Sequence, residues 1–431
     1  MDHKINEVIA PQYMAQFQCI GSECEDSCCT DEWKIYVDKV HYKKIEKAFS
    51  NNHRPREEFT KQFKRIRGPQ ANDFQYAEIM HSNGARCGLL KDDGTCELHS
   101  QYGSKILPDV CATYPRLNNV FLNRLERYGS LSCPEIARLC LLHKDSLKLG
   151  PLEITDFRPR AISKNLIKIE DNDFYALYLD EIRQTIIKLL SLPKYTFEQR
   201  MFFVIFFIVQ INDFFYQGIT DNPKEQLREA IQYINNEESL AEIVSLIPGI
   251  AIKLSQPVQL ITKLLTAGLA TSSPSTKHFS YVVMKYGLLD GITEENKVEL
   301  LSKSLDQYSE VKKSVSRIYS DRIDSYLTNY AMNYWLGNWY TDSPNLIIHM
   351  RKLLLRMAAL KYIFFNHPNI VDLKPIEEDD AQQNILDQTI VEVVYLLGRR
   401  FEHNQTRIDK MEEEMDKLDY GLPVLASLLK F

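Results

Sequence analysis

The sequence lacks several features that define familiar classes of protein. No apolar run approaches the roughly 20 residues that cross a bilayer, and the longest, residues 201–209, ends at polar residues. Residues 1–7 lack the apolar core of a secretion signal. We therefore expect a cytoplasmic protein with no transmembrane segment. The apolar run predicts a buried core helix, with contact to a membrane surface or to another subunit as the alternative.

Excess positive charge and glycine-rich loops are also missing. The chain has 52 Lys and Arg against 58 Asp and Glu, a formal net charge of −6. No basic field is available to hold phosphates, so nucleic acid is not the expected partner. No G-x-G-x-G or G-x-G-x-x-G motif occurs, so we predict no loop of the kind that presents backbone N–H groups to a nucleotide.

Cysteine is absent after Cys140 and concentrated before it. Four cysteines fall within eleven residues, and the other five complete the nine of the chain: Cys19, Cys24, Cys28, Cys29, Cys87, Cys96, Cys111, Cys133 and Cys140. Cysteines used as small core hydrophobes would be scattered. Structural disulfides are disfavoured in the cytoplasm, and an odd number would leave one thiol over. We interpret residues 1–150 as a module that binds a metal or cluster through thiolates.

The spacing in the first group leaves alternatives open. If a helix begins near Glu23, Cys24 and Cys28 lie on one face, close enough to share one centre. Cys29 would then point about 100° away from Cys28. Either the backbone breaks there, or Cys29 serves a second centre or remains a free thiol.

Two further patterns position later cysteines. Asp93-Gly94 is a hairpin-turn signal that brings Cys87 and Cys96 together across two short strands. Pro134 predicts the start of a helix that continues through Leu142, with Cys133 near its cap. Cys140 lies inside that helix among leucines, so we expect it to pack in the core. The other eight cysteines are the candidate metal ligands.

Beyond Gly150-Pro151 the sequence becomes helical in pattern. Together with a helix expected over residues 38–48, the predicted helices span residues 172–192, 198–217, 223–235, 238–250, 256–270, 294–336, 345–365, 379–399 and 404–417. The expected fold is mainly α. A cysteine-rich module with short strands (residues 1–150) precedes an all-α domain (residues 151–431).

Zinc and iron–sulfur clusters both use thiolate ligands, and the C-x4-C-x3-C-C spacing does not distinguish them. The motifs resemble the flagellin lysine-N-methylase family. The residues that carry the resemblance are Phe17-x-Cys19-x-Gly21-x-x-Cys24-x-Asp26-x-Cys28-Cys29 with Trp33, Cys87-x-Leu89-Leu90 through Gly94-x-Cys96, Cys111-Ala112-Thr113-Tyr114-Pro115-Arg116, Ser132-Cys133-Pro134-Glu135 and residues 329–334. The first group is also similar to small zinc- or iron-chelating domains.

The resemblance implies transfer of a methyl group from S-adenosylmethionine to ε-amines of flagellin lysines. It also implies that the module carries an iron–sulfur cluster of the four-iron type, with zinc as the alternative. Because the usual glycine-rich loop is missing, the S-adenosylmethionine site must be built differently. Aromatic faces attract cations, so Tyr330, Tyr334 and Trp335 are candidate cofactor-binding residues. Alternatively, Tyr326, Tyr330 and Tyr334 form a packed helix stripe.

Two other functions compete with methyl transfer. The chain would serve as a non-catalytic interaction or assembly protein if its zinc or iron were only structural. It would act in electron transfer or redox sensing if an exposed thiol such as Cys29 had a low pKa.

Overall fold

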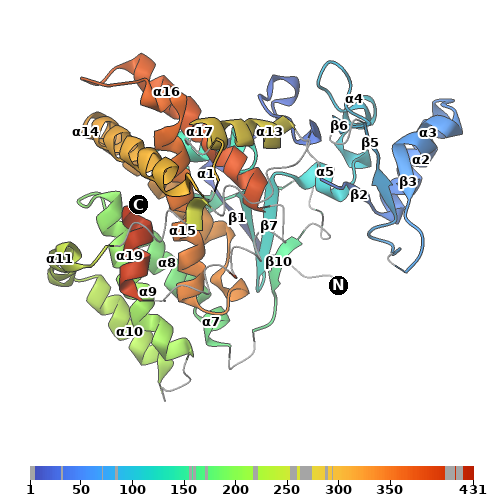
Figure 1. Cartoon of the computed structure of the whole chain (residues 1–431). Helices are drawn as coiled ribbons and strands as arrows, with labels where there is room; N and C mark the ends of the chain where they lie inside the picture. Colours follow the sequence, from blue (N-terminus) through green and yellow to red (C-terminus); the bar gives the residue numbers. More distant parts are fainter. Residues whose placement is uncertain are drawn as a thin grey trace.

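The structure, a computed structural model, is mainly α-helical, with short strands gathered in a central sheet and two smaller ones (Figure 1). This confirms the expected fold class in its main feature. The structure describes residues 5–30, 33–69, 71–82, 86–154, 158, 162–169, 173–216, 222–252, 260–262, 274–286, 290–293, 295–402, 413 and 421–431.

The central sheet has five strands in the order β10-β7-β8-β1-β9. Its strands are β1 (Glu7–Pro11), β7 (Arg116–Phe121), β8 (Arg124–Gly129), β9 (Leu149–Pro151) and β10 (Ile162–Leu166). β7 and β8 form a hairpin that turns at Leu122, whose φ is +54°. β1 runs parallel to β8 and antiparallel to β9, while β10 runs parallel to β7. The sheet therefore joins segments from both sides of residue 150.

Helices pack around this sheet and share one large hydrophobic cluster that extends from Ala10 to Phe431. We call these elements and the central sheet the helical body. The helices are α1 (Gln12–Gln16), α6 (Pro134–Leu142), α7 (Phe174–Leu177), α8 (Leu179–Leu190), α9 (Phe197–Tyr216), α10 (Pro223–Ile234), α11 (Glu237–Leu246), α13 (Pro274–Ser280), α14 (Lys297–Gly337), α15 (Leu346–Asn366), α16 (Pro368–Val371), α17 (Asp380–Glu402) and α19 (Leu422–Lys430).

A buried ion pair fixes the sheet to two of these helices. Glu126 of β8 is fully buried, and both of its oxygens accept hydrogen bonds from Arg183 of α8 at 2.8 Å. Arg183 also donates to the carbonyl of Leu336 in α14 at 3.3 Å. Arg124 adds a second cation at Glu126, with a 2.6 Å contact. The carboxylate is thus paired, as a buried charge must be.

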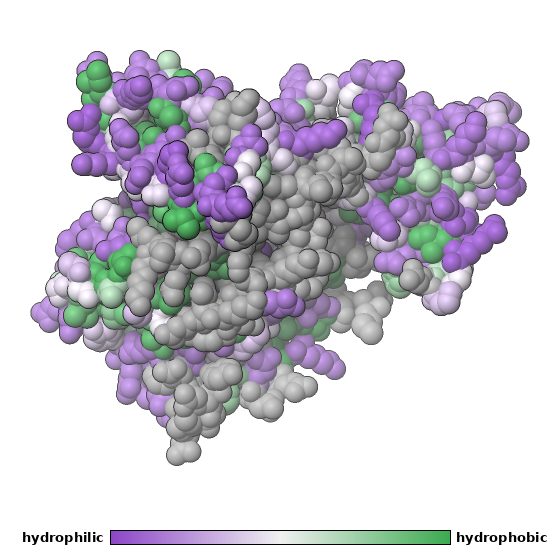
Figure 2. All heavy atoms as spheres, in the orientation of Figure 1, coloured by the Kyte–Doolittle hydropathy of each residue, from purple (hydrophilic) through white to green (hydrophobic). Residues whose placement is uncertain are grey.

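A second, smaller hydrophobic cluster lies apart, built from residues between Val37 and Leu107. Its elements, which we call the small lobe, are β2 (Tyr36–Val37), α2 (Lys39–Asn51), α3 (Arg56–Gln62), β3 (Phe63–Arg65), β4 (Ala77–Ile79), β5 (His81–Ser82), β6 (Arg86–Cys87), α4 (Glu97–Tyr102) and α5 (Asp109–Thr113). The strands form a β2-β4-β3 sheet and a β5-β6 pair. Figure 2 shows a mostly hydrophilic surface over the part of this lobe that carries α2 and α3.

Most predicted helices are confirmed within a few residues, namely α2, α6, α8, α9, α10, α11, α14, α15 and α17, whereas α13 and α16 were not predicted. Two predictions, residues 256–270 and 404–417, fall almost wholly outside the described residues. The apolar run at residues 201–209 lies in α9 and is largely buried, as expected. Among the described residues, no helix has the length and apolar character needed to cross a membrane.

Three local features differ from the sequence prediction. Glu7–Pro11, for which the sequence predicted no element, is a strand that pairs on both edges within the central sheet. The region after residue 150 is not wholly α-helical, because Ile162–Leu166 forms β10. No regular helix begins at Glu23, since the chain there forms two short 3-10 turns, Gly21–Glu23 and Cys28–Thr30. For the two strands, pairing with distant residues decides the local structure.

Candidate functional site: a thiol-rich face and its pocket

The loop from Cys19 to Cys29 is held by short-range hydrogen bonds. Gly21 has φ +59°, which a glycine adopts without strain. The Ser27 hydroxyl accepts from the backbone N–H of Cys29 at 3.2 Å, and its carbonyl accepts from the Thr30 hydroxyl at 2.7 Å. Cys28 and Cys29 lie together in a 3-10 turn, and their thiols are hydrogen-bonded to each other.

Cys29 lies beside cysteines of the small lobe. The 3-10 turn at Cys28–Thr30 packs against β6, which contains the buried Cys87. Cys29 and Cys96 both pack against the small hydrophobic cluster to which Cys87 belongs. Cys96 pairs with Leu90 in a single antiparallel bridge, and Gly94 turns the chain between them with φ +79°. The expected turn is confirmed, but Cys96 precedes α4 and stands in no second strand.

The electrostatics join Cys111 to the same neighbourhood. Burial, together with nearby Cys29 and Cys96, raises the pKa of Cys87 to about 12. Burial raises the pKa of the Cys111 thiol well above its ordinary value, although the residue as a whole is exposed. The neighbouring Cys29, Cys87 and Cys96 also raise it. A hydrogen bond with Cys28 lowers the pKa of Cys29 to about 7. Thiols crowded in this way favour deprotonation only when a cation shares their site.

Cys133 lies at a different place, at the N-cap position of α6. This confirms the predicted helix start. The pKa of Cys133 is raised to about 11, mainly by burial and also by nearby Cys24 and Cys19. Hydrogen bonds from the backbone N–H groups of Ile136 and Glu135 lower this pKa and partly offset the rise. Cys133 packs against the large hydrophobic cluster and not the small one.

Arg399 of α17 clamps the cysteine loop to the turn before α6. Its Nη1 lies 2.7 Å from the Asp26 carboxylate, its Nη2 donates to the Asp26 carbonyl, and its Nε donates to the Ser132 carbonyl at 3.2 Å. Arg138 of α6 forms an ion pair with Glu25. These contacts bring the loop that bears Cys24 and Cys28 to the helix end that bears Cys133.

Residues of the 329–334 motif hold the opposite end of α6. The side-chain amide of Asn329 donates to the carbonyls of Cys140, Leu141 and His143 at 3.1–3.2 Å. Asn333 accepts from the Tyr13 hydroxyl at 2.6 Å, and that hydroxyl accepts from the Gly129 N–H at 2.8 Å. This motif thus anchors the element that presents Cys133. Cys140 is fully buried, as the core assignment requires.

The predicted cofactor residues lie inside the helical body. Tyr330, Tyr334 and Trp335 are all buried, the last completely, which is the packed arrangement that the sequence also allowed. Within the described part of the chain, the buried indole N–H of Trp335 has no hydrogen-bond partner, nor does that of Trp339. Buried donors of this kind are usually paired by water or ligand, and the assignment to S-adenosylmethionine stays a prediction.

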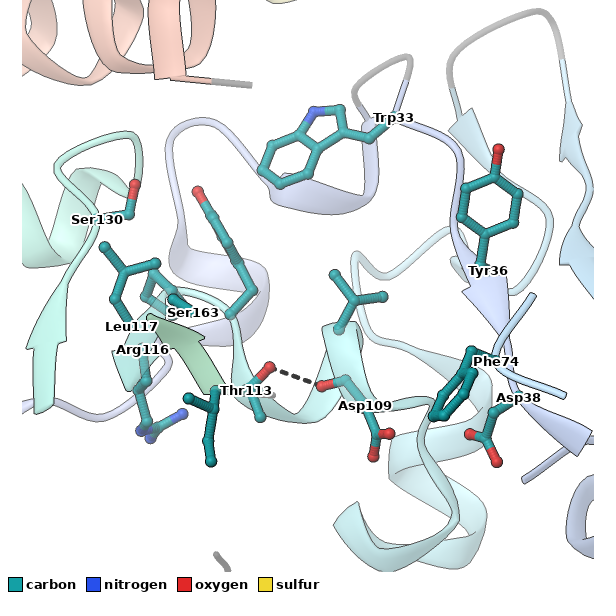
Figure 3. A pocket seen from close by; sticks show the side chains of 14 residues that line it. Trp33, Tyr36, Asp38, Phe74, Asp109, Thr113, Arg116, Leu117, Ser130 and Ser163 are labelled. Atoms are coloured by element: carbon teal, nitrogen blue, oxygen red, sulfur yellow. Dashed lines mark hydrogen bonds between the residues drawn. The ribbon is translucent and has the colours of Figure 1, made fainter. Parts of the chain in front are cut away.

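A pocket of about 440 Å³ lies between the small lobe and the central sheet (Figure 3), lined by residues that include Val110, the chain neighbour of Cys111, but no cysteine. The aromatic residues Trp33, Tyr36, Phe74 and Tyr114 contribute to its walls. Trp33 and Tyr114 meet edge to face, with ring centroids 4.8 Å apart. The Tyr114 hydroxyl lies 3.0 Å from that of Ser132, next to Cys133. The volume is in the range of small-ligand sites.

Two carboxylates give this pocket a negative end. Ligand atoms of Asp38, His41 and Asp109 all lie within 4.8 Å of one another, and Figure 3 shows the two aspartates flanking Phe74. Asp38 caps α2 by accepting from the N–H groups of Val40 and His41. Burial opposes its ionisation, but hydrogen bonds from His41 hold the pKa of Asp38 below its ordinary value.

Sequence reasoning did not identify this pocket. Trp33 and Tyr114 stand in the motifs that carry the family resemblance, so they were available as a signal. Asp38 gave only the signal of a helix cap, and its approach to Asp109, 71 residues later in the chain, depends on how α2 packs in the small lobe. Arg116, noted in the same motifs, lines the opposite side.

Comparison with known proteins places the chain in a family. The family model described as "FliB lysine N-methylase C-terminal domain" matches residues 183–429. The chain therefore belongs to the FliB lysine N-methylase family, as the cysteine motifs predicted. The match covers the helices of the helical body from within α8 to α19, whereas all nine cysteines precede it.

Relatives from Salmonella carry related names. The chain is 31% identical over 144 residues to "Flagellar biosynthetic protein FliU" of Salmonella muenchen, covering 33% of this chain and 82% of that protein. It is 30% identical over 144 residues to proteins named "Lysine-N-methylase" from Salmonella typhimurium and Salmonella choleraesuis. Those alignments span 34% of each relative's length. No solved structure matches the chain.

Proposed function

We propose that this protein is an S-adenosylmethionine-dependent lysine N-methyltransferase that acts on ε-amines of flagellin. The main support is membership of the FliB lysine N-methylase family over residues 183–429. The matched helices also hold the thiol face, through Arg399 and Asn329. Such a connection is what an enzyme needs if the module and the helical body act together.

The cysteine face is proposed to bind an iron–sulfur cluster, with zinc as the alternative. The donor chemistry fits either group, since both are held by thiolates, although no three cysteine sulfurs of the described residues lie within 4.8 Å of one another. When bound, such a cluster supplies electron transfer or Lewis acidity close to the pocket. The cysteine side chains would provide the ligands of the bound group.

The pocket between the small lobe and the central sheet suits a lysine side chain. Its aromatic walls cover the hydrocarbon stem, and aromatic faces and carboxylates both attract an ammonium group. Asp38 and Asp109 supply the negative charge. Methyl transfer breaks the sulfonium S–CH₃ bond and forms an N–CH₃ bond with the lone pair of the neutral amine. The amine must first lose its proton, because a free lysine titrates near ~10.4, and the Asp38–His41 pair is the nearest candidate to receive it.

The test is a methyl-transfer assay with labelled S-adenosylmethionine and purified flagellin, using anaerobically prepared protein. Asp38→Asn is the informative variant, because Asn caps a helix as well as Asp does but removes the charge. We expect KM for flagellin to rise about tenfold, the equivalent of about 1.4 kcal/mol. Lys39→Gln, which removes only an exposed pair with Asp73, is the control. No methyl transfer by the wild-type protein with intact metal would favour a non-catalytic binding role.

A further inference from the structure

The central sheet ends beside the pocket in a strand with one partner. Among the described strands, β10 pairs with β7 on one side and has no strand on its other side, because it stands at the end of the sheet. Ile162 and Ser163, the first two residues of β10, line the pocket. The outer edge of such a strand carries backbone N–H and C=O groups that can pair with another extended chain.

The pairing of β10 with β7 is irregular at the residue that lines the pocket. Ile162 is paired with Asn118 and Lys164 with Asn119, so Ser163 has no partner of its own on β7. A bulge of this kind leaves the extra residue unpaired with the neighbouring strand, and bulges are frequent beside active sites. Ser163 is also exposed. The strand is therefore accessible where it reaches the pocket.

The chain that leads into β10 is held against the small lobe. Arg158 is buried and donates to the carbonyls of Leu107 and Ser104 at 2.8 and 3.0 Å. It also donates to the Asp109 carboxylate at 3.2 Å. β10 begins at Ile162, four residues after Arg158. The start of β10 is thus fixed close to one of the two carboxylates of the pocket.

Two exposed apolar side chains line the pocket on the small-lobe side. Phe74 is 65% exposed and Val110 is 42% exposed. Figure 3 shows Phe74 beside Asp38 and across the pocket from Ser163. A single exposed apolar residue carries little meaning. Two that line one pocket, next to a carboxylate, offer an apolar contact to whatever enters beside the charged group.

We propose that the protein substrate binds as an extended strand along the outer edge of β10, with its lysine in the pocket and an apolar side chain two residues away against Phe74 and Val110. Strand addition takes its affinity from main-chain hydrogen bonds and its specificity from pockets for alternate side chains. Residues i and i±2 of a strand leave the same face, about 6.8 Å apart. This inference rests on the proposed function for the lysine and its pocket.

The charges favour this occupant over a second copy of the chain, which is the other common partner of a free strand edge. Asp38 and Asp109 attract an ammonium group. The lysine that β10 itself carries, Lys164, already forms an ion pair with Asp342. Two β10 strands paired edge to edge would therefore bring no uncommitted ammonium group from β10 to these carboxylates.

The first measurement is the binding of fluorescent peptides to the full, anaerobically prepared chain, followed by fluorescence anisotropy. The parent peptide has about eleven residues, with a central lysine, leucine two residues to either side and polar residues elsewhere. Single N-methylations remove its backbone donors one at a time. Only alternate residues of an added strand pair with the edge, so we expect about tenfold weaker binding at every second position. Equal losses at consecutive positions, or no binding at about 1 mM parent peptide, would overturn the proposal.

The second measurement tests the apolar contact. Moving both leucines next to the lysine keeps the composition and should weaken binding about tenfold, because those side chains leave the opposite face. Phe74→Ser should abolish this preference but bind a peptide with alanine in place of leucine as the wild type does. Leu149→Ser is the matched control, because Leu149 is 43% exposed on β9, at the other end of the same sheet. A preference retained in Phe74→Ser, or lost equally in Leu149→Ser, would contradict the contact.

Two further arms separate strand docking from its alternatives. Norleucine in place of lysine removes the ammonium group and keeps the hydrocarbon stem. Equal binding of that peptide, with the alternating pattern intact, would overturn the lysine pocket of the proposed function, whereas lysine selectivity without the alternating pattern would overturn only the strand docking. A dimer seen by sedimentation velocity, whose formation blocks binding of the parent peptide, would assign the edge to a second copy and overturn the proposal.

Discussion

The small lobe and the helical body are stabilised by different means. The helical body has one hydrophobic cluster that draws on α8, α9, α14, α15, α17 and the central sheet. The small lobe has a much smaller cluster of thirteen buried residues among those described, from Val37 to Leu107. Small cores are marginal without a disulfide or metal, and all nine cysteines are free. Apolar burial stabilises the helical body, and we propose that a bound metal or cluster adds to the stability of the small lobe.

The boundary between the regions is less simple than a cut at one residue. The division into residues 1–150 and 151–431 stays a prediction. The large cluster includes Tyr13, Tyr128 and Ile136 from before residue 150, and β10 joins the sheet from after it. A fragment that ends at residue 150 would expose these surfaces, so we expect metal binding by that fragment to depend on how well it stays folded.

Loss of the thiol-bound metal should have the largest effect on stability, and it should act on the small lobe and not on the helical body. Structural zinc sites contribute about 10–16 kcal/mol in small domains, so Cys24→Ala or Cys28→Ala should release metal and loosen the small lobe. Hydrogen exchange followed by mass spectrometry should show faster exchange in α2 and β6 but little change in α9 and α15. Full metal content with unchanged melting would contradict this assignment.

Glu126→Ala should destabilise the helical body and not the small lobe. It removes Glu126 from the buried Arg183 and leaves Asp180, 2.9 Å away, as its remaining carboxylate partner; breaking a buried pair typically costs about 3–5 kcal/mol. We expect a lower midpoint in denaturant with metal content retained. Glu126→Gln keeps the shape and one acceptor and should cost less.

The same residue gives a pH dependence. Burial opposes ionisation of Glu126, but Arg183 and Arg124 hold its pKa below the ordinary value. Its stabilising contribution is therefore present above the unfolded pKa of about 4.3 and lost as the pH falls through the folded pKa. Wild-type protein should lose melting temperature below about pH 4 more steeply than Glu126→Gln.

Arg399→Ala should loosen the contact between the cysteine loop and the helical body. It removes the contacts to Asp26 and Ser132, with an expected cost of about 1–3 kcal/mol and faster metal release to a chelator. Arg138→Ala is the matched control, because its pair with Glu25 is more than a third exposed on both sides and should contribute under about 1 kcal/mol. Equal metal-release rates in the two variants would argue against a special role for Arg399.

Cys140→Ala should have the smallest effect. The side chain is fully buried in the helical body, so its truncation should cost roughly 1 kcal/mol. Iron, sulfide and zinc contents should match wild type. Loss of any metal in this variant would place the ninth cysteine among the ligands.

The sequence by itself was enough to predict most of the helices, the family and a set of candidate thiol ligands. Helical periodicity and proline positions are local signals, so α6, α9 and α14 could be predicted to within a few residues. The crowding of cysteines before residue 141 is likewise visible along the chain, and it indicated a soft-metal site.

Only the tertiary structure decided which thiols lie together and where the pocket is. β1 and β10 are strands because of distant partners, which no local pattern reveals. Cys28 and Cys29 lie in a 3-10 turn, and the sequence alone left open whether a helix or a break in the backbone would hold them. Asp38 meets Asp109 only because α2 and α5 belong to one lobe. Sequence spacing fixes neighbours along the chain, whereas chemistry at a site depends on neighbours in space.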